Sequence, residues 1–402
     1  MGRINSTKQA LMSMTLAALA AWSTKAAAQE VVAKSSAVAP KIPSKVRLAH
    51  LPLTHLTAIA ARKGWLQEEF SKYNAKFDLV DTSAFAQATT ASLMDRGDLH
   101  IVRAMFNFAL QYPANGFDTV DIWGSTIVDR HRAQTIVLKE SDIQTVEQLK
   151  GHTLASSSTG CPYYASMEAL RSHGVTVDND FGKGDMRYVN ISGAAATSAF
   201  LAGRFEAFAI HPAQNTTASL YIQDQVRTLT TAVPDGVYVN SGGRSMEFAL
   251  RKWVNENPDL VKAFLVAQDR VVRWLAADHG KNFDEAATIV SREMRYPKAV
   301  ALYSIKDSSQ TNWEFGETDP DKLLNALKTY RNYQVSVKDP LYTKAKLTDA
   351  QIANTVDRRF FVGGEYFVDS GEKKATSGAK GALLNGGAEA SGTKVALAKS
   401  GR

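Results

Sequence analysis

The stretch "HTLASSSTGCPYYASMEALRSHG", from His152 to Gly174, decides the fold class of this chain. It passes from a short β-rich run into a loop of Ser, Thr, Gly and Cys, and then into a helical pattern that ends at a glycine. Pro162 suits the first turn of this helix, because the N–H group that proline lacks would have no partner within the helix. A strand, a polar loop and a helix in succession form the repeating unit of α/β proteins.

The same alternation extends outward along most of the chain. Short runs rich in Val, Ile, Leu and Thr recur, mostly bounded by Gly, Asp or Pro, and helical patterns fill several of the intervals. The candidate strands are residues 45–51, 77–83, 99–105, 119–127, 133–139, 152–157, 186–192, 206–212 and 227–232. This pattern predicts an α/β protein with mostly parallel sheets.

After Gly242 the pattern becomes mostly helical. Asn257 and Pro258 are expected to begin a long amphipathic helix. Asp319 and Thr348 are expected to cap two later helices, because short oxygen-bearing side chains accept hydrogen bonds from the first free N–H groups of a helix.

The first 28 residues have the pattern of a cleaved secretory signal peptide. Arg3 and Lys8 precede an apolar run over residues 10–22, and the segment ends in small residues, with cleavage expected after Ala28. The apolar run is shorter than the roughly 20 residues that span a bilayer, and no cysteine near the cleavage site offers a lipid anchor. We therefore expect an exported, soluble, non-lipidated protein, which the family resemblance described below places in the periplasm.

Both ends of the remaining chain have a low-complexity composition. Residues 29–44 are expected to form a flexible leader, and residues 371–402 a disordered basic tail that is rich in Gly, Ala, Ser and Lys. The formal charge of +7 comes from the signal peptide and this tail, so residues 29–370 are close to neutral. Nucleic-acid binding is not expected, because it needs a basic stripe on the folded part.

Motifs for an enzyme, a cofactor or a metal are missing from the sequence. It has no dinucleotide fingerprint, P-loop, His-Glu-x-x-His or nucleophile elbow, so no cofactor is expected. The eight histidines are scattered, and the single cysteine, Cys161, excludes an intramolecular disulfide and any site of several thiolates.

Polar residues follow many of the predicted strands, at the end where ligands bind in open α/β sheets. Such a residue alone is usually a helix cap or a turn residue, but together they form a candidate site. The polar residues at strand ends are Thr54, His55, Thr82, Ser83, Asn107, Ser125, Thr126, Ser156 to Cys161, His211, Gln214 and Asn215. Ser158, Thr159 and Cys161 precede a helix start, where free N–H groups and the helix dipole favour an anion such as a sulfonate or a carboxylate.

Four stretches make the chain resemble the periplasmic substrate-binding proteins of ABC importers for nitrate, aliphatic sulfonates and taurine, a family related to the binders of thiamine-pyrimidine precursors. They are "VRLAHLPLTHLTAIAARKGWLQEEF", "AQTIVLKESDIQTVEQLKGHTLASSS", "AAATSAFLAGRFEAFAIHPAQ" and "NPDLVKAFLVA". The resemblance covers residues 45–365.

The resemblance implies a type II, two-lobed periplasmic-binding-protein fold, in which a hinge closes the lobes on a ligand like a Venus flytrap. Lobe one is expected at residues 45–138 and 240–365, and lobe two at residues 139–239. The implied function is to capture a small anionic organic solute and deliver it to an inner-membrane permease, as a monomer. A role as an accessory of a sensor or chemoreceptor fits the sequence equally well.

The resemblance also implies ligand contacts at Thr54, His55, Ser83, Asn107, Cys161, Tyr163 and His211. Two positions depart from the family pattern. Thr159-Gly160 replaces the usual Gly-Ser, and His211-Pro212 replaces the usual Trp-Pro, which implies a more polar pocket that responds to pH.

An enzyme on the same fold is the alternative, because some relatives of this scaffold carry out chemistry, including a desulfinase that uses a cysteine. Cys161 at a helix N-terminus would have a lowered pKa, and the thiolate is the nucleophilic form. His55 or His211 would then serve as the base. An oxidising compartment is unfavourable for a lone reactive thiol, which favours the binding protein.

Overall fold

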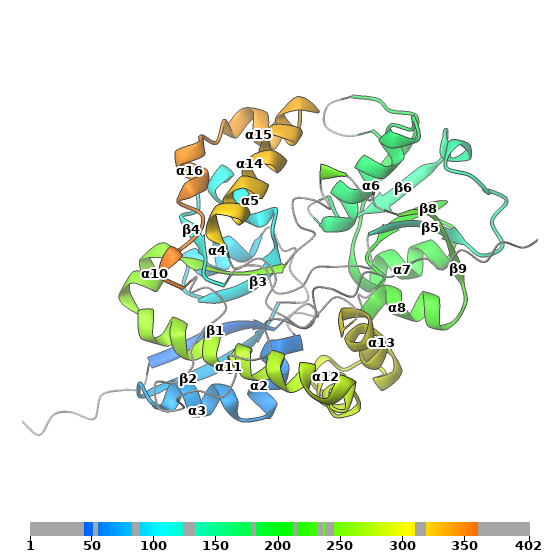
Figure 1. Ribbon diagram of the computed structural model, residues 1–402. Coiled ribbons are helices and arrows are strands. Elements are labelled where there is room, and N and C mark those ends of the chain that lie inside the picture. Colours follow the sequence, from blue (N-terminus) through cyan, green and yellow to red (C-terminus); the bar gives the residue numbers. More distant parts are fainter. Residues whose placement is uncertain are drawn as a thin grey trace, which may run out of the picture.

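The computed structural model shows two α/β lobes side by side, each built on a five-stranded sheet (Figure 1). It describes residues 44–50, 55–82, 89–123, 133–158, 160–178, 182–212, 215–231, 233, 236–237, 245–309 and 319–360. The predicted signal peptide, the leader apart from Ser44 and the predicted tail lie outside these residues.

The first sheet has the strand order β2-β1-β3-β10-β4. Strands β1, β2 and β3 are parallel, whereas β10 runs antiparallel to both of its neighbours. Four of its five strands therefore run in one direction. The strands are β1 (Ser44–His50), β2 (Ala75–Asp81), β3 (Ile101–Met105), β4 (Thr119–Asp121) and β10 (Ser245–Leu250).

The second sheet repeats this plan with the order β7-β6-β8-β5-β9, in which only β5 runs antiparallel to its neighbours. The strands are β5 (Gln134–Leu138), β6 (Thr153–Ser156), β7 (Arg187–Asn190), β8 (Ala207–Ile210) and β9 (Val226–Thr231). The prediction of mostly parallel sheets in a periplasmic-binding-protein fold is confirmed.

Two features of the sheets differ from the sequence-based description. Strand β5 lies in the second sheet, whereas the expected boundary after residue 138 assigned it to lobe one. Strand β4 of the first sheet ends at Asp121 and β5 of the second sheet begins at Gln134, whereas β9 of the second sheet ends at Thr231 and β10 of the first begins at Ser245. Strand β10 was not predicted, because the sequence after Gly242 was interpreted as mostly helical; its residues 246–249 are all buried.

Helices flank the two sheets. Those of the first lobe are α2 (His55–Arg62), α3 (Trp65–Ser71), α4 (Thr90–Asp95), α5 (Phe108–Ala114), α10 (Arg251–Glu256), α11 (Pro258–Ala276), α12 (Phe283–Met294), α13 (Lys298–Ser309), α14 (Pro320–Ser336), α15 (Pro340–Ala345) and α16 (Asp349–Ala353). Those of the second lobe are α6 (Cys161–Ser172), α7 (Gly193–Leu201) and α8 (Asn215–Ile222). Short 3₁₀ segments are Glu147–Leu149, Ala277–Gly280 and Arg358–Phe360.

Helix ends follow the local sequence in most cases. The Asp319 carboxylate accepts from the N–H groups of Asp321 and Lys322, and Thr348 forms a capping box with Gln351, as predicted. Pro258 begins α11 as predicted, but the Asn257 side chain donates to the Trp253 carbonyl instead of capping the helix.

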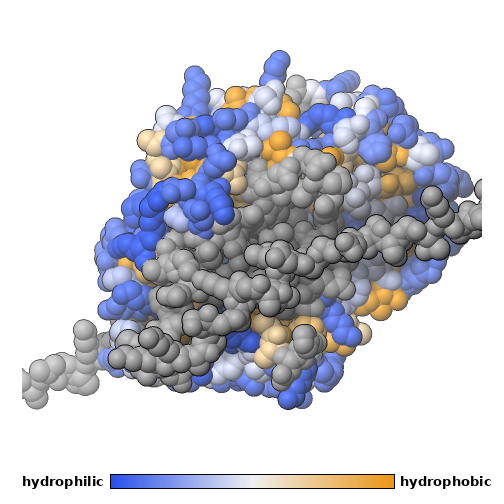
Figure 2. Space-filling model, in the orientation of Figure 1, coloured by the Kyte–Doolittle hydropathy of each residue, from blue (hydrophilic) through white to orange (hydrophobic). Residues whose placement is uncertain are grey.

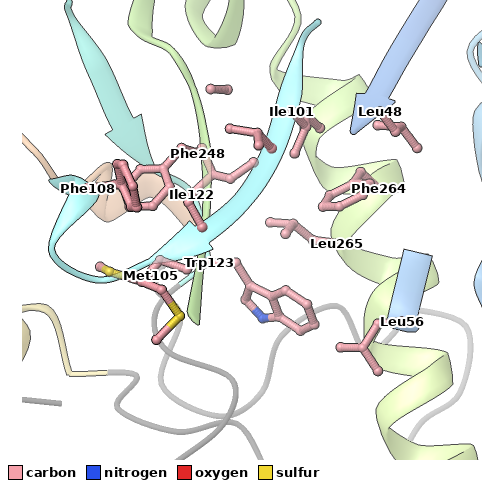
Figure 3. Close-up of a cluster of buried hydrophobic side chains, with 14 of the residues drawn as sticks. Leu48, Leu56, Ile101, Met105, Phe108, Ile122, Trp123, Phe248, Phe264 and Leu265 are labelled. Carbon is pink, nitrogen blue, oxygen red and sulfur yellow. The ribbon is translucent and has the colours of Figure 1, made fainter. Parts of the chain in front are cut away.

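Each sheet is buried between apolar side chains. In the first lobe Leu48, Ile101, Phe264 and Leu265 pack together between the sheet and α11 (Figure 3). In the second sheet successive residues point to opposite faces, so two separate clusters form. Val137, Leu154, Ala207 and Ala209 belong to one cluster, and Ile136, Ala155, Phe208 and Ile210 to the other.

The lobes contact each other through helices. Helix α13 of the first lobe packs against both α12 and α8, and α6 of the second lobe packs its first turn into the core of the first lobe. Hydrophilic residues cover most of the described surface on the face seen in Figure 2, with apolar residues in small separate groups. Within the described ranges, none of the helices has the length and apolar character to cross a membrane.

Candidate functional site

The structure places only some of the predicted ligand contacts. Thr54, Ser83, Thr126 and Thr159 lie outside the described residues. His55 and Cys161 are the first residues of α2 and α6, but nothing is described of their side chains. The structure describes both the backbone and the side chain of four predicted contacts, which are Asn107, Ser158, Tyr163 and His211.

Ser158 and His211 lie at the same level of the second sheet. Strands β6 and β8 are parallel neighbours with Ala155 opposite Phe208, so each of the two polar residues comes three positions after this pair. The His211 carbonyl accepts from Thr217 Oγ1 at 2.6 Å, which links the end of β8 to α8. The carboxyl edge of the sheet thus brings these two predicted contacts together.

The backbone around the start of α6 is less open to an anion than the sequence suggested. The Ser158 N–H donates to Asn190 Oδ1 at 3.0 Å, the Gly160 N–H to the Ser157 carbonyl at 3.3 Å, and the Tyr163 N–H to the Gly160 carbonyl at 3.1 Å. Three backbone N–H groups of this turn therefore already donate hydrogen bonds within the protein. The positive end of the 12-residue helix dipole remains as the electrostatic feature that favours an anion.

Aromatic rings cover the carboxyl end of β6. The Tyr163 ring lies 5.1 Å from that of Tyr164 and 5.3 Å from that of Tyr188, both edge to face. Tyr188 Oη donates to the Ser156 carbonyl at 2.9 Å, and burial raises the pKa of Tyr188, so its hydroxyl stays neutral. Tyr163 is half-buried in this cluster, and its contact with a solute stays a prediction.

Two polar residues mark the carboxyl edge of the first sheet. Asn107 lies two residues after the end of β3 and is fully buried, and its carbonyl accepts from the N–H groups of Leu110 and Gln111 at the start of α5. Thr82 follows β2 and is also fully buried, and its hydroxyl has no hydrogen-bond partner among the described residues. Thr82 lies at a predicted strand end, but it is not among the predicted ligand contacts. Its burial without a partner marks it as a candidate, because buried polar groups are nearly always hydrogen-bonded.

The edges of the two sheets meet at a hydrogen bond between the lobes. Gln111 of α5 donates from Nε2 to Tyr164 Oη of α6 at 2.7 Å, and both side chains are buried. Gln111 lies four residues after Asn107, and Tyr164 lies three residues after Cys161. The helix starts that follow β3 and β6 are therefore held next to each other, which sequence reasoning did not foresee.

A buried charged cluster lies within the first sheet. Arg103 of β3 donates from Nη1 to Glu247 Oε1 of β10 at 2.9 Å, and both residues are 1% exposed. Asp121 of β4 is also fully buried. Burial raises the pKa of Glu247 to about 7, against the opposing effect of Arg103, and burial together with Glu247 raises the pKa of Asp121. Both acids thus retain protons more readily than at the surface.

The described residues contain no group of three or more His, Cys, Asp or Glu side chains that could hold a metal ion. The described polar groups near the strand ends include hydroxyls, amides, aromatic rings and the imidazole of His211. Such groups suit the non-covalent binding of a small polar solute.

Comparisons with known proteins agree with this architecture. Residues 103–281 match the family model described as "NMT1/THI5 like". No curated protein sequence matches the chain.

Several solved structures share the arrangement of the chain. The alkanesulfonate-binding protein SsuA of Xanthomonas axonopodis pv. citri, bound to MOPS, is 17% identical with a TM-score of 0.61, over 78% of this chain and 98% of that one. The aliphatic sulphonate binding protein SsuA of Escherichia coli is 17% identical with a TM-score of 0.58, over 75% and 92%. The nitrate-binding protein NrtA of Synechocystis PCC 6803 is 13% identical with a TM-score of 0.57, over 80% and 87%.

These likenesses lead to one conclusion: the chain has the periplasmic-binding-protein fold, and its residues 103–281 match the NMT1/THI5-like family.

Proposed function

We propose that this protein is the solute-binding component of an ABC importer. It captures a small anionic solute, a sulfonate or taurine-like compound or nitrate, between its lobes and delivers it to a permease in the inner membrane. The protein acts as a binder in the periplasm and not as an enzyme.

One observation carries this proposal. The Gln111–Tyr164 hydrogen bond joins the helices that follow β3 of one sheet and β6 of the other, so the carboxyl edges of the two sheets lie next to each other. In open α/β sheets these edges are the places where ligands bind. A solute held there contacts both lobes, and its binding energy favours their closure.

The ligand class is inferred from the donors at these edges. The N-terminus of α6, the hydroxyl of Thr82 and the polar residues Ser158 and His211 all suit oxyanions. Proteins of similar fold include binders of alkanesulfonates and of nitrate, which are both small oxyanions. We therefore expect a compact anionic head group with room for a short organic part.

A binding screen tests the function. Purified protein is heated with ethanesulfonate, taurine, nitrate, sulfate, bicarbonate, acetate or a pyrimidine, and native mass spectrometry records any solute that co-purifies. A true ligand raises the melting temperature further at each higher concentration, because it binds only the folded state. Turnover of a sulfinate or sulfonate without stabilisation by any anion would overturn the proposal.

Thr82→Val tests the site itself. Valine keeps the shape and removes the hydroxyl, so the ligand-free protein should be as stable as wild type or slightly more stable, since a buried hydroxyl without a partner costs free energy. Affinity for the identified anion should fall about tenfold if the hydroxyl donates to it.

Thr119→Val is the matched control. Thr119 is buried and its hydroxyl also lacks a partner among the described residues, but it begins β4 at the opposite edge of the same sheet. Its replacement should leave anion affinity unchanged. Equal losses of affinity in both variants would refute the assignment of Thr82.

A further inference from the structure

We infer that Gln111 and Tyr164 are positioning residues, whose hydrogen bond holds the N-terminus of α6 against lobe one and thereby sets the affinity of the cleft. This inference rests on the proposed function, because it concerns the regulation of the same site. Neither residue needs to touch the solute for this role.

The hydrogen bond between Gln111 and Tyr164 lies close to the starts of both helices. Gln111 comes one helical turn after Asn107 at the start of α5, and Tyr164 comes one turn after Cys161 at the start of α6. Because a helix moves as a rigid unit, the distance between these two helix starts follows from the geometry of the bond. The width of the predicted binding region at this place is therefore fixed by one amide and one hydroxyl.

The Tyr164 side chain is buried at the contact between the lobes. Tyr164 belongs to lobe two by sequence, but its side chain packs into the hydrophobic core of lobe one together with Ala165. Its ring lies 6.0 Å from that of Tyr330 on α14, edge to face, and Tyr330 in turn packs against Phe106 at 4.9 Å. Opening of the lobes at this place would expose both the ring and the hydrogen bond to water, so the contact favours the closed arrangement.

A second contact lies further along the same helix. Arg171 donates from Nη1 to Tyr333 Oη of α14 at 2.7 Å, at the surface. Helix α6 is therefore tied to lobe one at two points seven residues apart, one buried and one exposed. The buried contact dominates, because an exposed hydrogen bond competes with water.

The test is a double-mutant cycle with Tyr164→Phe, Gln111→Met and the two combined. Gln111→Met leaves the buried Tyr164 hydroxyl without its partner, so affinity for the anion found in the screen should fall about tenfold. Tyr164→Phe should lower affinity by a smaller factor, because Gln111 keeps its interaction with the Tyr342 hydroxyl. The double variant removes both polar groups, and its affinity should return to within about threefold of wild type. Circular dichroism and thermal melting establish that each variant folds.

Tyr112→Phe is the control. Tyr112 is fully buried on α5 next to Gln111, and its hydroxyl shares a hydrogen bond with Thr90 Oγ1 of the same lobe at 2.7 Å. Loss of that hydroxyl should lower stability but leave anion affinity unchanged, because the bond does not join the lobes. A similar loss of affinity in this variant would show that any change in the aromatic cluster acts on the cleft, and would overturn the specific role of the bond.

A measurement without solute separates this inference from the proposed function. Small-angle X-ray scattering of the ligand-free proteins should give a larger radius of gyration for each single variant than for wild type, and a smaller increase for the double variant. This result would support the inference even if wild type bound no anion in the screen. Wild-type scattering and wild-type affinity in both single variants would overturn it, as would additive losses in the double variant.

Discussion

Glu247→Gln gives the sharpest test of the electrostatics, because the buried cluster contains one cation and two acids. Arg103 faces Glu247 at 2.9 Å and lies within electrostatic range of Asp121, and among the described residues no further positive group acts on either carboxyl. If both acids were ionised, one negative charge would be left in excess in a fully buried place. Retention of a proton removes this excess, because a buried charge without compensation is costly.

The magnitude follows from the pKa of Glu247. Burial raises it from 4.5 to about 7 in the folded protein, so between these values the folded protein holds a proton that the unfolded chain releases. The contribution of Glu247 to stability is thus fully present below about pH 4.5 and is lost as the pH rises through about 7. The free energy of unfolding that Glu247 contributes below pH 4.5 therefore exceeds its contribution above pH 7 by about 3 kcal/mol.

Urea denaturation followed by tryptophan fluorescence from pH 5 to pH 8 provides the assay. Glutamine mimics the protonated acid, so Glu247→Gln should be more stable than wild type by only about 1 kcal/mol at pH 5 and by about 3 kcal/mol at pH 8. The difference between the two proteins isolates Glu247 from His100, whose pKa is lowered by burial and Arg47, so that its contribution is lost as the pH falls.

A control and a clear refutation accompany this test. Glu256→Gln removes a carboxylate at the exposed end of α10 and should not reproduce the difference. If Glu247→Gln instead destabilises the protein increasingly toward pH 8, the attraction between Arg103 and Glu247 outweighs the cost of burying them. The reasoning from desolvation would then be wrong.

Three further predictions are simpler. Cys161→Ser should change anion affinity by no more than about threefold in calorimetry, because a hydroxyl can donate where the thiol lies; lost turnover with unchanged binding would support the enzyme instead. Thr348→Ala should lower the free energy of unfolding by about 1 kcal/mol, because it removes the capping box of α16, and an unchanged urea midpoint would contradict this. Gly64→Ala should cost about 1 kcal/mol, because the φ angle of 77° between α2 and α3 strains any side chain, although open space surrounds the position.

Local features of the fold were predictable, because they depend on residues close together in the sequence. Asp319 and Thr348 cap the helices that follow them, and Pro162 and Pro258 lie in first turns. Each of these outcomes depends on a few neighbouring backbone groups. The strands were found for the same reason, as short β-rich runs between turn residues.

Features that join distant parts of the chain were not predictable. Arg103 and Glu247 are 144 residues apart, and neither residue shows from its neighbours that it is buried. Strand β10 is short and alternates only over residues 245–248, and it lies directly before a long helical region. Gln111 and Tyr164 are 53 residues apart, and each has the local context of an ordinary helix residue. The predicted ligand contacts at Thr54, Ser83, Thr126 and Thr159 stay predictions.

The position of β10 has a consequence for the order in which the chain folds. All five strands of the second sheet lie within residues 134–231, so this lobe is complete in sequence before residue 245 is synthesised. The first sheet needs β10 between β3 and β4, because these two strands have no direct pairing with each other. More than 120 residues are therefore synthesised after β4 before β10, the strand that joins β3 to β4, becomes available. The second lobe is the natural first folding unit on the ribosome, and the first lobe is the part that depends on late long-range contacts.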